Sequence, residues 1–143
     1  MKTQKISASK LEDVTISIKL KLAMLWTSLM FLIIYLDYFH LYMPGKIQDI
    51  LKGRVFVFDI SQGFLVVALV LIATPALMIF LSVALPAKIN RWINIITAAV
   101  NIPCILFNLA GEAWVHMVTG AVIQVILLSL IIRYAWKWPC TQV

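Results

Sequence analysis

Apolar residues run almost without interruption through four long stretches of the chain, and short polar segments separate them. The stretches cover residues 20–42, 62–85, 89–109 and 114–136. A helix rises about 1.5 Å per residue, so about 20 apolar residues cross the hydrocarbon core of a bilayer. Each stretch is long enough to do so, and the pattern predicts an all-α integral membrane protein with four transmembrane helices.

The links between the last three stretches are very short. Residues 86–88 join the second stretch to the third, and residues 110–113 join the third to the fourth. Short links make consecutive helices antiparallel neighbours. The sequence therefore predicts an up-down-up-down four-helix bundle, in which residues 1–143 form a single membrane domain.

The N-terminal segment, residues 1–19, precedes the first span. Ser9 and Glu12 have the capping-box spacing that starts helices. Residues 14–22 instead alternate with the period of a strand. Because lysines are tolerated where a helix enters a membrane, we favour an interfacial helix that leads into the first span.

The outer loop, residues 43–61, is the longest connection. Pro44-Gly45 predicts a turn, and residues 46–51 predict a short helix that stops at Gly53. Ser61 and Asp59, just before the second span, are candidates for its N-cap because their side chains accept hydrogen bonds from free helix amides.

Composition agrees with a membrane protein. The chain is 63% hydrophobic and 13% charged, with a mean hydropathy of +1.00. Soluble domains are about half apolar and about a quarter charged. The net charge of +6 does not indicate nucleic acid, because the basic residues lie at the ends of apolar runs rather than in a patch of base-stacking aromatics.

The distribution of basic residues predicts the orientation. Nine of the twelve basic residues lie on the side that holds the two termini and the link at residues 86–88, and three lie in the outer loop. The more basic side faces the cytoplasm, so both termini are predicted to be cytoplasmic. Aromatic residues at the two interfaces would form belts, with Trp26, Trp92, Trp136 and Trp138 inside and Tyr35, Tyr38, Tyr42 and Trp114 outside.

Several motifs carry a resemblance to a known group. They are "YLDYFHLYMPGKIQDIL", "PALMIFLSVALPAKINRWINII" and "IIRYAWKWP", of which "DYF" followed by "PGK", "NRW" and "YAWKWP" are the most specific. From about Glu12 to Pro139 the chain resembles an uncharacterised family of small bacterial four-span membrane proteins. The resemblance implies a four-helix fold in a bacterial inner membrane, and it implies no activity.

Polar residues gather near the outer ends of the predicted spans. With the middle of each run at the bilayer centre, Asp37 lies about 9 Å outward, and His40, Asn108 and His116 lie about 13 Å outward. Glu112 lies at the outer interface. Ionisable groups in a span require a partner or a function, so this outer polar layer is a candidate site.

The layer admits three interpretations. Asp37 and His40 share one helix face, as do Glu112 and His116. Carboxylate–histidine pairs on facing helices build metal centres, so these four residues are candidate ligands of a divalent metal. The layer is otherwise a contact for a proton or a small ligand, or hydrogen-bonding glue that closes the bundle. No cofactor is expected.

A second polar pattern follows the third span. Asn90, Asn94, Asn101 and Asn108 are spaced 4, 7 and 7 residues apart and therefore lie on one stripe. Gln124 lies near the middle of the fourth span and is placed to pair with Asn101. The stripe predicts hydrogen bonds between helices, with the wall of a pathway or ligand pocket as the alternative.

Two prolines interrupt the spans. Pro75 and Pro103 remove amide donors and free the carbonyls of Leu71 and Ala99 near the midplane. Such kinks either open a cavity or let a helix bend as it packs.

Three functions remain open at this point. The polar groups favour binding or transport of a small ligand, an ion or a proton, in the bilayer and as a homo-oligomer. The alternatives are a metal-dependent membrane enzyme at the outer face and an accessory subunit without chemistry of its own.

Overall fold

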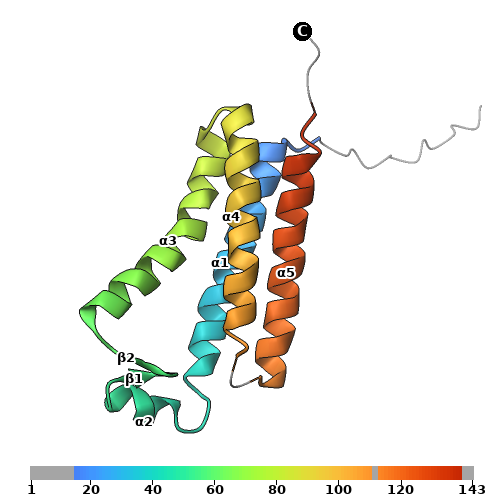
Figure 1. Ribbon diagram of the computed structural model, residues 1–143. Coiled ribbons are helices and arrows are strands. Elements are labelled where there is room, and N and C mark those ends of the chain that lie inside the picture. Colours follow the sequence, from blue (N-terminus) through green and yellow to red (C-terminus); the bar gives the residue numbers. More distant parts are fainter. Residues whose placement is uncertain (1–14, 111–112, 140–143) are drawn as a thin grey trace, which may run out of the picture.

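A computed structural model describes residues 15–110 and 113–139 (Figure 1). Four long helices form a bundle: α1 (Ile18–His40), α3 (Gln62–Ala84), α4 (Ala87–Phe107) and α5 (Val115–Trp136). All four are long and apolar enough to cross a membrane. The predicted fold class, an all-α bundle of four membrane-spanning helices, is confirmed.

The helices begin and end within two residues of the predicted apolar stretches. Ser17 caps α1, where its Oγ accepts a hydrogen bond from the Leu20 amide at 3.4 Å. Ser61 caps α3 as predicted, accepting from the Phe64 amide at 3.2 Å. The predicted N-terminal interfacial helix falls largely outside the described residues, and residues 15–17 are not helical.

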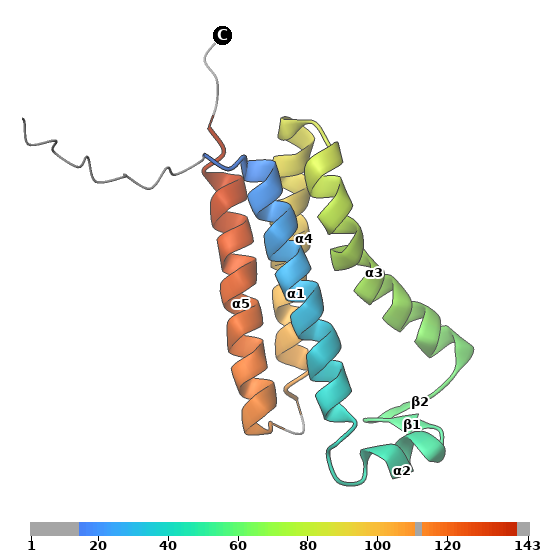
Figure 2. The ribbon, with the colours of Figure 1, turned by 180° about the vertical axis from the view of Figure 1, so that it is seen from behind.

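The helices are arranged around α1, which packs between α3 and α5, while α4 packs on α5 (Figures 1 and 2). We call the end that carries the outer loop the outer end. The opposite end, where α1 starts and α5 finishes, is the inner end. The largest fully buried side chains include Trp26, Leu22, Leu29, Met78, Leu128 and Ile131. Most of the dense core therefore lies in the inner half and the middle of the bundle.

The predicted place of Trp26 is wrong. The sequence placed it in an aromatic belt at the membrane interface, but its side chain is completely buried. Trp92 and Trp136 remain exposed at the inner end, as a belt requires, and their ring centroids lie 5.9 and 5.6 Å from the Arg91 guanidinium carbon. The reason for the difference is a buried hydrogen-bond partner for the Trp26 indole, described below.

Helix α3 packs over only half its length. Its buried residues are Pro75, Met78 and Ser82, all in the inner half. Toward its start the helix leans away from α1 and α4 (Figures 1 and 2), and residues 65–67 and 69–72 are exposed on every side. The buried contacts begin at the proline, where an interior helical proline removes a hydrogen bond and bends the helix.

The outer loop contains α2 (Lys46–Leu51), as predicted, and a small hairpin that the sequence did not predict. Strands β1 (Arg54–Val55) and β2 (Phe58–Asp59) pair antiparallel. The residue at the turn, Phe56, has φ 56°, a left-handed conformation that is unusual for a bulky residue. Asp59 pairs with Arg54 across the strands at 3.6 Å instead of capping α3.

Helices α1 and α5 approach closely at Gly120. A Cβ atom at this position would lie 2.5 Å from both terminal methyl carbons of Leu36. The missing side chain therefore lets Leu36 of α1 pack directly on the α5 backbone, which is the small-residue contact that membrane helices use.

We expect Gly120→Ala to destabilise the bundle by about 1–3 kcal/mol, because the added methyl group overpacks Leu36. Reversible unfolding in mixed micelles measures this. Gly63→Ala is the control, since a Cβ there meets only the Ser61 Oγ at 3.9 Å. The double variant with Leu36→Ala should lose less stability than the two single losses combined, and simple additivity would contradict the contact.

Candidate functional site

Two contacts set the relative heights of the helices. Trp26 of α1 bonds to Asn94 of α4, and these helices run parallel. Leu36 of α1 packs on Gly120 of α5, which runs antiparallel. His40 lies as many residues outward of Trp26 as Asn108 lies outward of Asn94, so His40 and Asn108 are at the same height. By the same count from Leu36 and Gly120, His116 is also level with His40.

Asp37 lies one turn inward of His40 on α1. Its side chain is exposed and interacts electrostatically with His40. The carboxylate accepts no hydrogen bond from any other residue in the described ranges, 15–110 and 113–139. An intramembrane carboxylate without a hydrogen-bond donor is costly in hydrocarbon, so Asp37 is the most conspicuous candidate of the set.

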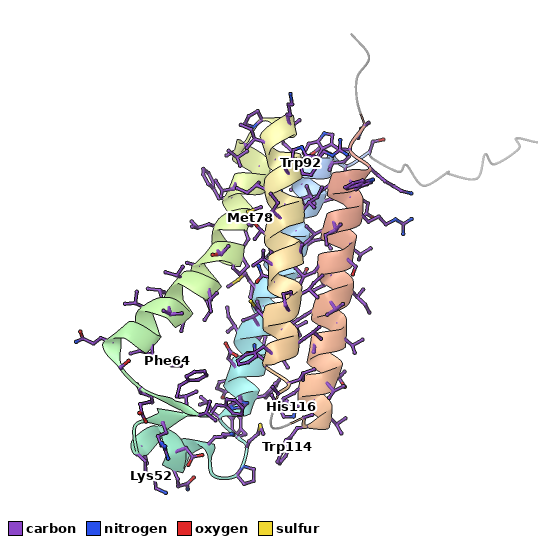
Figure 3. All side chains as sticks on the ribbon, viewed as in Figure 1. Lys52, Phe64, Met78, Trp92, Trp114 and His116 are labelled. Atoms are coloured by element: carbon purple, nitrogen blue, oxygen red, sulfur yellow. The ribbon has the colours of Figure 1, made fainter. Side chains whose placement is uncertain are left out.

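The two histidines differ in their surroundings. His40 is half-buried and has a partner beyond Asp37. The Nε2 atom of His116 is buried and has no hydrogen-bond partner among the described residues. Figure 3 shows His116 beside Trp114 at the outer start of α5, where the two rings make an edge contact with centroids 6.1 Å apart.

The predicted metal set is only partly described. Glu112 lies outside the described residues, so its place relative to Asp37, His40 and His116 is open. Within the described part of the chain, no group of three His, Cys, Asp or Glu side chains is close enough to hold a metal ion.

An open cavity of about 390 Å³ lies between the outer ends of α1 and α5. The sequence did not indicate it, because its walls come from residues on either side of helix ends. Aromatic and sulfur side chains surround His116 there: Phe39, Tyr42, Met43 and Trp114. The neighbouring hydroxyls of Tyr38 and Tyr42 are hydrogen-bonded to each other.

Near the middle of the bundle, Asn101 and Gln124 lie at the same height but are not bonded to each other, contrary to the predicted pairing. The Asn101 amide donates to the carbonyl of Thr97 on its own helix at 2.8 Å. Gln124 is buried, and its side chain makes no hydrogen bond to the described part of the protein. Asn108, farther out, is exposed.

The inner half of the asparagine stripe behaves differently. Asn94 Oδ1 accepts from the Trp26 indole at 2.6 Å and from Ser82 Oγ at 3.2 Å. The Asn94 amide donates to Asn90 Oδ1 at 2.6 Å, and the Asn90 amide donates to the Ser82 carbonyl at 2.5 Å. All four residues are fully buried. We call them the inner network; it links α1, α3 and α4.

The sequence found only part of this network. The asparagine spacing identified Asn90 and Asn94, whereas Trp26 was assigned to the interface and Ser82 was not singled out. One signal for Ser82 was available in the sequence. It is a serine in an apolar run, and the short link at residues 86–88 folds it back toward the asparagine stripe.

The comparisons with known proteins identify a family. A model described as a family of unknown function, DUF6326, matches residues 11–142. No curated protein and no solved structure matches the chain.

We expect Asn94→Leu to lower the free energy of unfolding by about 1–2 kcal/mol, because it leaves the Trp26 indole N–H and the Asn90 Oδ1 without a hydrogen-bond partner in a dry core. Unfolding in mixed micelles checks the loss. Asn108→Leu is the matched control on the same stripe and should stay within about 0.5 kcal/mol of the parent protein. Equal losses of unfolding free energy in Asn94→Leu and Asn108→Leu would contradict a stabilising role of the inner network.

Proposed function

The chain belongs to DUF6326, a family of unknown function, and we propose that it binds a proton or a small cation at the outer end of the bundle and transports it across the bilayer. The binding residue in this proposal is Asp37. Asn108 lies one turn farther out, at the entrance, and Asn101 and Gln124 form the polar path that leads from Asp37 to the midplane.

The observation that carries the proposal is a contrast between the two halves of the bundle. In the inner half, every buried asparagine is hydrogen-bonded to a neighbour. In the outer half, Asp37, Asn101 and Gln124 make no side-chain hydrogen bond to another helix in the described residues. Lipid cannot satisfy polar groups, so these three favour water or a ligand as their partner.

The chemistry of the path favours a cation. Asp37 is the only carboxylate within the described helices α1, α3, α4 and α5. A proton neutralises it, and a cation compensates its charge, so both relieve the unfavourable burial of an ion in hydrocarbon. Amide side chains such as Asn101 and Gln124 present carbonyl oxygens that solvate a cation on its way inward.

The shape of the bundle favours a site that the transported ion can reach from only one side of the membrane at a time. The inner end is closed by the inner network and by fully buried Leu22 and Leu29. At the outer end, α3 stands away from α1 and α4 (Figure 1). In the proposed cycle α3 pivots at Pro75, and broken or bent helices around a midplane site are how many transporters alternate access.

Orientation and assembly complete the proposal. The basic inner end would face the cytoplasm of a bacterium, with both termini on that side. A homo-oligomer is proposed because a single four-helix unit is narrow. The outer half of α3, apolar on every side, is the natural surface for a second copy.

We expect Asp37→Asn to lower proton flux by about tenfold or more, a loss that corresponds to about 1.4 kcal/mol. Purified protein in liposomes that contain a pH-sensitive dye measures it, with a potassium diffusion potential as the driving force. Asp49→Asn, which removes an exposed carboxylate of α2, is the matched control. Proton flux that survives Asp37→Asn, or that in the parent protein matches empty liposomes, would overturn proton transport. Uptake of a small inorganic cation such as Na⁺ into the same liposomes then tests the alternative of cation transport.

The path itself is tested by thiol accessibility. In a background in which serine replaces Cys104 and Cys140, Gln124→Cys should react with a membrane-impermeant thiol reagent added on the outer side, because only a hydrated thiol ionises and reacts. Val122→Cys, two residues away and 54% exposed on the helix surface, should stay unreactive in lipid. The opposite order would contradict a hydrated path.

A further inference from the structure

A second cavity lies at the inner end, in the groove between α1 and α5. Its volume is about 530 Å³. The walls combine aliphatic side chains with one cation, one phenol and one hydroxyl: Ile16, Leu20, Lys21, Met24, Leu25, Ser28 and Tyr134. None of the residues proposed to carry transport lines this groove.

The groove has the dimensions of a lipid chain in one leaflet. Ile16 lines the groove just before α1, and within α1 the wall runs from Leu20 to Ser28, which is about 12 Å of helix. One leaflet contributes about half of a hydrocarbon core of about 30 Å. From Lys21 toward the middle of the bundle the lining is apolar except for Ser28, whose hydroxyl already donates to the Met24 carbonyl at 3.0 Å.

Lys21 is the polar anchor of the groove. Its Nζ atom lies 5.6 Å from the centroid of the Tyr134 ring, so the two side chains meet across the groove. A cation–π contact leaves the ammonium hydrogens available for an acceptor. No carboxylate of the described chain pairs with Lys21.

The inner end as a whole is strongly basic. The described Asp residues, Asp37, Asp49 and Asp59, all lie toward the outer end, and residues 15–110 and 113–139 include no Glu. The described inner end therefore holds cations without counter-charges: Lys19, Lys21, Lys88, Arg91, Arg133 and Lys137. Basic pockets between membrane helices bind anionic lipid headgroups.

We propose that the α1–α5 groove is a binding site for an anionic phospholipid. The headgroup phosphate bonds to the Lys21 ammonium and the Tyr134 hydroxyl, and one acyl chain lies along Leu20, Met24 and Leu25. Charge complementarity selects an anionic lipid over a zwitterionic one, and the apolar slot selects a lipid over free phosphate.

The test uses the full chain in detergent, with phosphatidylglycerol or phosphatidylcholine added and lipid binding followed by native mass spectrometry and thermal stability. The parent protein should retain and be stabilised by phosphatidylglycerol more than by phosphatidylcholine. Lys21→Gln should weaken phosphatidylglycerol binding about fivefold, the factor expected for one lysine near a membrane surface. Inorganic phosphate should have no effect.

Lys88→Gln is the matched control, because it removes the same charge from the inner end at an exposed position outside the groove. It should leave phosphatidylglycerol binding nearly unchanged. Ser28→Phe fills the end of the groove nearest the middle of the bundle and should weaken phosphatidylglycerol binding without changing charge. Equal preference for the two lipids, equal losses in Lys21→Gln and Lys88→Gln, or stabilisation by inorganic phosphate would each overturn the site.

Discussion

The hydrogen bond from the Trp26 indole to Asn94 joins the first helix to the third span at a depth where water is absent. In lipid the hydrophobic effect does not press helices together, so polar contacts and close packing must hold them. Asn94 serves both purposes because it also receives Ser82 of α3 and binds Asn90. One asparagine therefore joins three helices in the inner half of the bundle, and the Gly120–Leu36 contact joins α5 to α1 toward the outer end.

The rest of the architecture follows from how far this inner anchoring extends. Helix α3 is bound to α1 and α4 only from Pro75 to its end, so its outer half is free of the packing that holds its inner half. The asparagine stripe consequently changes character along α4. Asn90 and Asn94 bond to residues of α3 and α1, whereas the Asn101 amide bonds only to its own helix. The stripe thus bonds helices to one another at its inner end, whereas at its outer end it makes no side-chain hydrogen bond to another described helix.

Hydropathy and link length were sufficient to predict the four helices, because membrane thickness dictates how long an apolar run must be. The rotation of each helix about its axis was not accessible in the same way. Asn101 and Gln124 share a height, which a sequence reveals, but their side chains do not meet, which depends on rotation. Trp26 was misplaced for the same reason: tryptophan usually marks an interface, and only the facing Asn94 identifies it as a core residue.

The hairpin was missed because its two-residue strands are too short to show a periodicity. The turn depends on Phe56 in a left-handed conformation, which no propensity rule assigns to phenylalanine. The outer cavity was missed because its walls come from residues that are distant in sequence. What could be predicted from the chain was the set of polar residues, and what required the structure was their pairing.

The tilt of α3 has a consequence for the membrane around the protein. A tilted helix of 23 residues covers less of the bilayer normal than an upright one, so its preferred angle depends on hydrocarbon thickness. The other three helices are fixed to one another and respond little. A thicker bilayer would draw α3 upright toward α1 and α4, and a thinner one would tilt it farther, so the physical state of the lipid adjusts the width of the outer end.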